Sequence, residues 1–497
     1  MITEETYKWI EKLDDTIDIT DYNRLVLNYF IIDKSDWYEE IEGKKKWDDL
    51  KVKQFWFLIR KYTMSYVTRQ KLINFENFIF PDREYYSHQF NSGKRITQSM
   101  NFWRNIDDKK ISQNINFKNA VFLGDFYIYK AVFKGFINFE NTKFLGEFSI
   151  TQNCTFEGEI NFENAIFNEN TFFHNQFFNK INFYQAKFKS LANFDDSIFK
   201  QSINFENTYF EKDAYFNGCK FNENTNFEGA DFSQQTLFID TEFKKEVSFS
   251  GAEFKGDTNF YRTEFYNLVN FENSIFLGDK KFYFLDLEGD NLKLSFKNTI
   301  FSKSILFRRI NFTNTTFLES DLTDLKFREC EWGNESRIIL HDEKSIDFKE
   351  KSNLKSLEAL YRQLKKNFET TKNWELSGKA YVSEMEMRKR RLWLERNYYQ
   401  WFIYKFYDVF GGYTQDFGKP IVSLVGLILV FSGLYFFIDY DILKAFQRGV
   451  KGALPYMQID TENPFTGYWL ILRNLELVLG GTFLAFFILA LRKRFKQ

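Results

Sequence analysis

The sequence predicts a mainly β protein in which a narrow β-solenoid fills the central half and α-helices follow it. Phenylalanine recurs at alternating steps of five and six residues from Phe183 to Phe282, so an 11-residue unit repeats nine times. Neither the period of a helix nor that of a strand places side chains on one face at that spacing, whereas a chain that turns a corner about every five residues does. Helical periodicity after residue 350 and two long apolar segments after residue 420 predict the helical C-terminal part.

The overall composition limits the class of protein. A chain of 497 residues is too long for one core, so two or three units are expected. The net charge of −1 gives no basis for a nucleic-acid partner. Cys154, Cys219 and Cys330 lie far apart without a CxxC pair, which favours free thiols in a reducing compartment. The three histidines form no ligand cluster, so neither a metal nor a cofactor is expected, and the acidic N-terminus lacks the apolar core of a signal peptide.

The N-terminal part precedes the regular repeats. Residues 1–72 mix aromatic and charged side chains, and we expect a small helical cap that covers the open end of the solenoid. Repeat character begins at residue 73, is interrupted by a charged, aromatic insertion at 81–113, and becomes regular from about 115. The solenoid is expected to end near residue 333.

The residues around each phenylalanine predict which side chains point inward. A small residue such as Ala186 or Cys219 stands two positions before every second phenylalanine, and large and small inward residues at i and i−2 are typical of a narrow solenoid. Asparagine often precedes the other phenylalanine, as at Asn182, and suits a corner where its amide bonds to the turn backbone. We expect these phenylalanines in the structural core: Phe183, Phe188, Phe194, Phe199, Phe205, Phe210, Phe216, Phe221, Phe227 and Phe232.

Units such as INFENTYF and TNFEGADF resemble the pentapeptide-repeat family, in a phenylalanine-rich form with an extra residue in alternate pentapeptides. The resemblance covers about residues 115–332 and implies a right-handed quadrilateral β-helix. Four sides would take about 22 residues per coil. About ten coils, stacked at a strand spacing of ~4.8 Å, would give a rod on the order of 50 Å long.

Residues 350–410 have the pattern of a basic, amphipathic helical linker. An apolar stripe at helical spacing runs from Leu354 to Phe368, and a basic run follows at 388–391. Tryptophan and tyrosine crowd between Trp393 and Tyr407, as in an aromatic belt at a membrane interface. The linker is therefore expected to lead into a membrane.

Two apolar segments predict a two-helix transmembrane domain over residues 420–497. Residues 421–438 carry no charge, and residues 468–491 are long enough to span but contain Arg473 and Glu476. Basic residues flank both segments on their non-connecting sides, so both termini and the solenoid are expected in the cytoplasm of a multi-pass protein of the cell (inner) membrane. The lipid bilayer is therefore an expected partner.

The best candidates for pore or intramembrane sites lie in and before the second segment. Ionisable residues in a span are costly, so Arg473 and Glu476 are candidates: they could pair with each other or with a neighbouring subunit, or else lie at the outer interface. Gly480 and Gly481 suit either a hinge or plain close packing of helices, and packing is slightly favoured. Tyr456 and Asp460, the remaining candidates, lie in and just after a short uncharged stretch that has the pattern of a re-entrant piece.

The basic helix LYRQLKKNFETTKNWELSGKAYVSEMEMRKRR and the ending FFILALRKRFK resemble the C-terminal ion-channel-like domain of membrane-bound bacterial pentapeptide-repeat proteins. This resemblance covers about residues 354–497 and implies a pore in the bacterial cytoplasmic membrane, coupled to the solenoid through the linker. Because two spans cannot enclose a pore, a homo-oligomer is expected, with a tetramer as the first guess. The connection reads ALPYMQID where a potassium filter would have Gly-Tyr-Gly, so potassium selectivity is not predicted.

Two alternatives to a pore remain. The chain could be a membrane-tethered scaffold without transport activity, with a protein partner on a solenoid face. It could instead mimic DNA, as soluble pentapeptide-repeat proteins that bind gyrase do, but its acidic residues alternate with lysines and a membrane anchor has no use there. No phosphate loop, zinc motif or catalytic triad is present in the sequence, so no enzymatic activity is expected.

Overall fold

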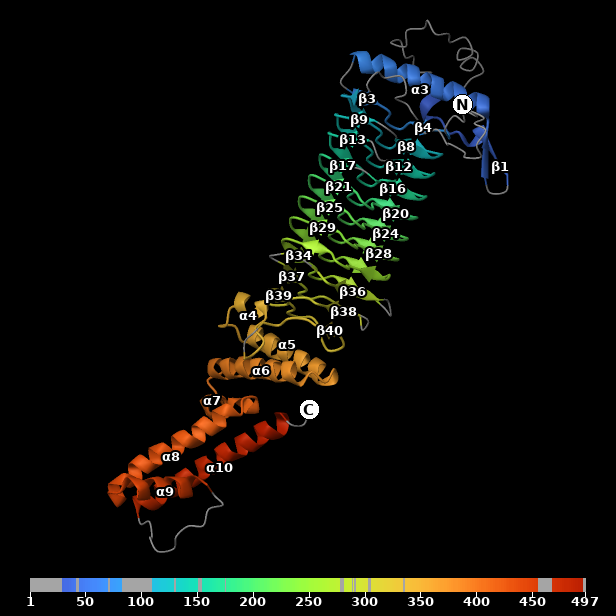
Figure 1. Ribbon diagram of the computed structural model, residues 1–497. Helices are drawn as coiled ribbons and strands as arrows, with labels where there is room; N and C mark the ends of the chain where they lie inside the picture. Colours follow the sequence, from blue (N-terminus) through green and yellow to red (C-terminus); the bar gives the residue numbers. More distant parts are fainter. Residues whose placement is uncertain are drawn as a thin grey trace. The chain divides into compact units, whose positions relative to one another are not determined.

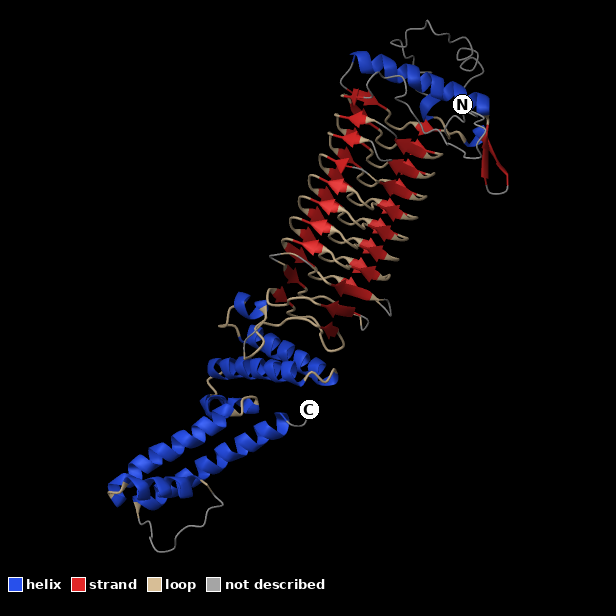
Figure 2. Cartoon of the chain, in the orientation of Figure 1, coloured by secondary structure: helices blue, strands red, loops and turns tan. Residues whose placement is uncertain are grey.

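The computed structural model describes residues 29–41, 44–69, 72–82, 110–128, 131–150, 154–174, 176–277, 281–287, 289, 292–302, 305–333, 336–454 and 467–494. The chain divides into two compact units, Met1–Glu331, here called the solenoid unit, and Trp332–Gln497, the helical unit. Figure 1 labels the strands of the first and the helices of the second, and Figure 2 shows the change from strand to helix along the chain. The finer division of the chain into domains, with boundaries at residues 72, 333, 350, 410 and 420, stays a prediction. Most of the insertion at 81–113 lies outside the described residues, as do residues 1–28 of the expected cap.

The solenoid is built from four parallel β-sheets, one for each side of the coil. Sheet 1 contains β3 (Leu72–Asn74), β6 (Asn114–Asn116), β10 (Ile137–Asn138), β14 (Ile160–Asn161), β18 (Ile181–Asn182), β22 (Ile203–Asn204), β26 (Thr225–Asn226), β30 (Val247–Ser248), β34 (Leu268–Asn270), β37 (Lys293–Ser295) and β39 (Thr315–Thr316). Sheet 2 contains β4 (Ile79–Phe80), β7 (Val121–Phe122), β11 (Lys143–Phe144), β15 (Ile166–Phe167), β19 (Lys187–Phe188), β23 (Tyr209–Phe210), β27 (Asp231–Phe232), β31 (Glu253–Phe254) and β35 (Ile275–Phe276). Sheet 3 contains β8 (Phe126–Ile128), β12 (Phe148–Ile150), β16 (Thr171–Phe173), β20 (Ala192–Asn193), β24 (Ala214–Tyr215), β28 (Thr236–Leu237), β32 (Thr258–Asn259), β36 (Phe282–Leu285), β38 (Ile305–Arg308) and β40 (Lys326–Arg328). Sheet 4 contains β5 (Lys110–Ile111), β9 (Val132–Phe133), β13 (Thr155–Phe156), β17 (Gln176–Phe177), β21 (Ile198–Phe199), β25 (Lys220–Phe221), β29 (Glu242–Phe243) and β33 (Glu264–Phe265).

The register confirms the repeat length expected from the phenylalanine spacing. Ile181 of β18 pairs with Ile203 of β22, and Asn204 bonds to Asn182, 22 residues earlier. One coil therefore takes 22 residues, and the solenoid has about nine turns, close to the ten expected. The quadrilateral cross-section is confirmed by the four sheets.

The phenylalanines form stacked columns inside the coil. The rings of Phe183 and Phe205 lie 5.0 Å apart at an interplanar angle of 1°, and those of Phe205 and Phe227 lie 4.7 Å apart at the same angle. All the phenylalanines predicted for the core are buried, at no more than 1% exposed. Burial of each ring is worth roughly 1.5–3 kcal/mol, so these columns are the main source of the solenoid's stability.

Asparagine at the corners also acts as predicted. The Asn182 Oδ1 atom accepts a hydrogen bond from the backbone N–H of Tyr184 at 3.1 Å, and its Nδ2 donates to Asn161 in the coil before it at 2.9 Å. The next corner residue has a left-handed backbone, with φ of 55° at Gln185. These asparagines stabilise the turn and join successive coils.

The small inward positions have a second requirement that the sequence reasoning missed. Their hydroxyl groups donate to a phenylalanine carbonyl of the coil before: Thr208 Oγ1 to Phe183 O at 2.8 Å, and Thr241 Oγ1 to Phe216 O at 2.7 Å. Cys219, in the same position, directs its Sγ to Phe194 O at 2.9 Å. Serine and threonine are tolerated in this core because each polar atom has a partner.

The described part of the N-terminal region contains more than the expected helix. It comprises η1 (Ser35–Trp37), an antiparallel hairpin of β1 (Tyr38–Ile41) and β2 (Lys44–Trp47), and helix α3 (Asp49–Arg69). Trp56 of α3 stacks on Phe80 of the first coil, with ring centroids 5.9 Å apart, and its Nε1 donates to Asp82 O at 2.8 Å. The segment covers the first coil, as a solenoid cap should, but the hairpin was not predicted.

The helical unit contains α4 (His341–Ser345), α5 (Lys351–Thr370), α6 (Trp374–Leu394), α7 (Tyr398–Gly411), η3 (Gly412–Thr414), α8 (Gly418–Asp439), α9 (Ile442–Ala453) and α10 (Tyr468–Arg494). The expected linker at 350–410 is three helices, because the chain turns before Asn373 and Asn397, whose side chains cap the N-termini of α6 and α7. The apolar stripe from Leu354 to Phe368 is buried on α5, as predicted.

Candidate functional site

The first candidate site is a buried carboxylate between the two apolar helices. Glu476 of α10 is fully buried, and its Oε2 atom accepts a hydrogen bond of 2.7 Å from the hydroxyl of Tyr435 on α8. Tyr435 is itself only 1% exposed. The other carboxylate oxygen, Oε1, is buried without a hydrogen-bond partner. A buried charged group costs free energy unless it is paired, so this environment keeps Glu476 a candidate for a functional residue.

Helix α9 returns from the end of α8 and packs against both α8 and α10. The turn places Tyr440 in the left-handed region and Asp441 at the N-terminus of α9, where its carboxylate accepts bonds from two backbone N–H groups. Gly449 of α9 lies so close to α8 that a Cβ atom would overlap the hydroxyl of Ser432. Of the uncharged stretch expected as a re-entrant piece, the structure describes only the residues up to Leu454, at the end of α9, so the re-entrant path itself stays a prediction.

Two glycines let α9 approach α10. A Cβ atom at Gly452 would overlap the carboxylate of Glu476, and one at Gly480 would overlap the backbone carbonyl of Ala453. At Gly481, by contrast, a Cβ atom would meet nothing within 4 Å. Gly480 thus allows the close packing that the sequence favoured. Gly481 has open space beside it, so the packing of this chain would also accommodate a larger residue there.

The remaining predicted site residues are not all brought together. No ion pair joins Arg473 to Glu476 in the described part of the chain, where Glu476 bonds to Tyr435 instead. Tyr456 and Asp460 lie outside the described residues.

The sequence reasoning missed Tyr435 and the small residues of α9. Ala445, Gly449 and Ala453 recur at every fourth position of α9 and are buried. Small residues at this spacing are typical of membrane helices that pack closely, so the signal was present. Tyr435 carried no such local signal.

The outer surfaces of α8 and α10 are apolar and exposed. Gly418–Ile438 and Tyr468–Lys493 are long and apolar enough to cross a membrane. In the most apolar 18-residue stretch of each helix, only 11% and 22% of the residues are buried. Val422, Phe437 and Val478 are each more than 60% exposed. Helices of a soluble core would hide such side chains, so these two helices could cross a bilayer.

A network of ion pairs joins α5 and α6 next to these helices. Glu358 and Glu384 are buried, and Arg388 bonds to both, at 2.9 Å and 3.3 Å. Although burial disfavours its charge, hydrogen bonds from Arg391 and Arg388 hold the pKa of Glu358 below its ordinary value. The basic run at 388–391 is therefore largely paired rather than a free basic patch.

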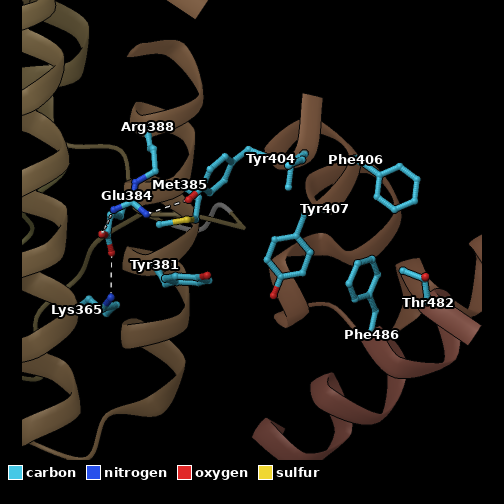
Figure 3. A pocket seen from close by; sticks show the side chains of 11 residues that line it. Lys365, Tyr381, Glu384, Met385, Arg388, Tyr404, Phe406, Tyr407, Thr482 and Phe486 are labelled. Atoms are coloured by element: carbon cyan, nitrogen blue, oxygen red, sulfur yellow. Dashed lines mark hydrogen bonds and ion pairs between the residues drawn. The ribbon is translucent and has the colours of Figure 1, made fainter. Parts of the chain in front are cut away.

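A cavity of about 710 Å³ lies between this network and α7 and α10 (Figure 3). Its polar wall comes from α5 and α6, and its apolar wall from α7 and α10. The following side chains line it: Lys365, Tyr381, Glu384, Met385, Arg388, Ile403, Tyr404, Phe406, Tyr407, Thr482 and Phe486. Nothing in the sequence pattern predicted it, because four helices contribute.

The described residues of the solenoid were predicted to serve structure, and their surroundings agree with that. Among the described residues no group of three His, Cys, Asp or Glu side chains could hold a metal ion. Burial raises the pKa of the Cys219 thiol well above its ordinary value, which opposes a nucleophilic role and agrees with its inward position. The Nδ1 atom of His174 lies 2.9 Å from the carbonyl of Asp195, at the surface of the coil.

Comparison with known proteins defines the class of the solenoid. Residues 238–283 match the family model described as Pentapeptide repeats (9 copies), and the coils of the solenoid share their 22-residue register with this segment. No curated protein and no solved structure gave a match. The chain is thus a parallel β-solenoid over pentapeptide repeats, followed by C-terminal helices of which two are apolar enough to span a membrane.

Proposed function

We propose that this chain is an integral membrane protein in which a cytoplasmic pentapeptide-repeat solenoid is coupled to an ion-channel-like pore. The observation that supports it best is the arrangement of α8, α9 and α10. Helix α8 would be the first span, α9 the short helix that returns beside it, and α10 the second span. A pore lined by re-entrant segments is built from parts of these three kinds.

Polar contacts within this bundle support the proposal. The bond from Tyr435 to Glu476 joins α8 to α10, and Gly452 seats α9 against the same carboxylate. A bundle that served only as an anchor would need neither a buried carboxylate nor a returning helix.

The pore would be formed by several copies, because two spans and one short helix cannot enclose a channel. We expect a homo-oligomer, a tetramer first, in the cell (inner) membrane of a bacterium, with both termini cytoplasmic. The exposed apolar faces of α8 and α10 leave surface for both lipid and neighbouring copies. No potassium selectivity and no enzymatic activity are part of the proposal.

Proteoliposomes containing the full-length chain test the pore. We expect flux of small ions above that of empty vesicles, and a native mass that corresponds to an oligomer. Gly480→Ala should abolish flux, because its methyl group would meet the Ala453 carbonyl and displace α9, whereas Gly481→Ala is the matched control with open space. Glu476→Ala should alter conductance or assembly while the melting of the solenoid stays unchanged.

A monomer without flux for any small cation or anion would contradict the pore. That result would favour the alternative, a membrane-tethered scaffold that binds a protein through the solenoid. Equal loss of flux in Gly480→Ala and Gly481→Ala would contradict the role given to α9 within one chain.

A further inference from the structure

We propose that the cavity between α5, α6, α7 and α10 binds an anionic phospholipid. Its phosphate would meet Lys365 and Arg388, and its acyl chain would lie against Phe406 and Phe486. The inference rests on the membrane placement in the proposed function, but it does not require that the protein conducts ions.

The polar wall offers N–H donors suited to a phosphate. Lys365 Nζ bonds to Glu384 at 3.0 Å, which uses one of the three N–H groups of an ammonium. Arg388 donates to the hydroxyl of Tyr404 at 3.2 Å, and both side chains line the cavity. Figure 3 shows Lys365 and Arg388 on either side of Glu384, with Tyr404 beside Arg388. A phosphate has oxygen atoms to accept bonds from both cations at once.

The charges around the cavity do not balance. Two buried carboxylates, Glu358 and Glu384, are shared by four basic side chains: Arg362, Lys365, Arg388 and Arg391. Glu395 pairs with Arg391, which leaves a surplus of one positive charge. Lys493 of α10, whose Nζ lies 4.9 Å from the ring centroid of Tyr381, is a fifth cation. Glu369 interacts with it electrostatically and is a fourth carboxylate, so the surplus stays at one positive charge. The surplus would be neutralised by an anion.

The opposite wall is apolar and continues onto the surface that lipid would cover. Phe486 and Thr482 belong to the candidate span of α10, and Phe406 contacts Phe486 with ring centroids 6.5 Å apart. Ile403, which also lines the cavity, is 47% exposed, and its neighbour Phe402 is 62% exposed. A free phosphate would gain nothing from this wall, whereas an acyl chain would bury it.

The size and position of the cavity agree with this occupant. Its volume of about 710 Å³ lies within the range of roughly 300–1,000 Å³ usual for ligand sites. Trp393 of α6 and Trp401 of α7, with ring centroids 4.9 Å apart, lie on two of the four helices that border the cavity. Tryptophan is a residue type enriched at the level of the lipid headgroups. The site would thus hold a lipid headgroup where the linker helices meet the membrane.

The test measures lipid binding by the full-length protein in mild detergent. Native mass spectrometry counts bound phosphatidylglycerol and phosphatidylcholine of the same acyl chains over a concentration series. Lys365→Gln removes a cation from the polar wall, and Thr482→Trp fills the cavity from the apolar wall without changing charge. Lys405→Gln is the matched control, because Lys405 is an exposed cation of the bordering helix α7 that does not line the cavity.

We expect the wild type to bind phosphatidylglycerol at least about tenfold more tightly than phosphatidylcholine, and each cavity variant to lose roughly that factor. Lys405→Gln should bind as the wild type does. Circular dichroism checks that each variant keeps its secondary structure, and the two cavity variants act on different walls, so one misfolded protein would leave the other informative.

Three results would overturn the lipid site: equal affinity for the two lipids, an equal loss in Lys405→Gln and Lys365→Gln, or competition by free glycerol phosphate as strong as by intact lipid. The last would show a site for phosphate alone. If the protein discriminates between the two lipids but conducts no ions, the pore is contradicted and the lipid site is supported. If it conducts ions but does not discriminate between the lipids, the lipid site is contradicted and the pore is supported.

Discussion

Replacement of Phe205 by alanine is the most direct test of the phenylalanine columns. Phe205 is fully buried in the middle of the solenoid and stacks on Phe183 below and Phe227 above. It also meets Phe194 and Phe216 edge to face, at centroid distances of 5.4 and 5.7 Å. The substitution removes all four ring contacts and leaves a cavity that flat, hydrogen-bonded coils cannot close.

The expected cost is about 3–5 kcal/mol, the usual range for loss of a buried phenylalanine. At roughly 1.4 kcal/mol per factor of ten, amide exchange in the neighbouring coils should accelerate about 100- to 4,000-fold. Hydrogen exchange with mass spectrometry on the full-length protein measures this coil by coil. Because each coil contacts only its neighbours, the effect should be largest in peptides from Phe183 to Phe227 and fall off with distance.

Glu206→Ala supplies the control one residue away. The Glu206 side chain is partly exposed and accepts only a 3.3 Å hydrogen bond from Asn226, so its removal should change exchange by less than about threefold. If the two substitutions accelerated exchange equally, the inward register assigned to the phenylalanines would be wrong.

Three further substitutions or conditions test other parts of the molecule. Tyr435→Phe should destabilise the α8–α10 bundle by about 1–3 kcal/mol in detergent unfolding, because it leaves Glu476 without its partner, while Tyr440→Phe, at a side chain that is 79% exposed, should have no effect. Cys219 should resist alkylation by iodoacetamide at neutral pH in the folded protein and react only after denaturation, since burial raises its pKa; rapid labelling of the native protein would refute this. The folded-state pKa of Glu358 is below its ordinary value of 4.5, so its charge stabilises the linker helices above about pH 4.5, and this contribution is lost as the pH falls through the folded pKa. The difference in unfolding free energy between wild type and Glu358→Gln should therefore shrink on acidification. A difference that does not depend on pH would contradict the ion pairs.

The solenoid could be predicted in detail because its information is local and repeated. The spacing from Phe183 to Phe205 already contains the length of one coil, and Asn182 signals its corner. What the repeat did not show was the left-handed backbone at Gln185, a residue type with no preference for that conformation. There the coil geometry overrides local propensity.

The candidate site could be predicted only in part, because its contacts join distant segments. The charge in an apolar helix identified Glu476, but its partner Tyr435 is 41 residues away and has no charge of its own. Gly480 and Gly481 are identical neighbours in the sequence, and only the return of α9 toward one of them makes them different. The cavity between α5, α6, α7 and α10 requires four helices in their final positions.

The 22-residue register has a consequence for changes in the length of the chain. Residues 11 apart lie on opposite sides of the coil, as Ile181 in sheet 1 and Ala192 in sheet 3 do. Duplicating or deleting a full 22 residues would lengthen or shorten the rod by ~4.8 Å and leave every later side chain facing the same way. An insertion of 11 residues would keep each phenylalanine inside but turn everything downstream by half a revolution. Length can thus be altered in steps of a full coil without any change of orientation, whereas half a coil changes both, which makes this chain suited to molecular rulers of chosen length.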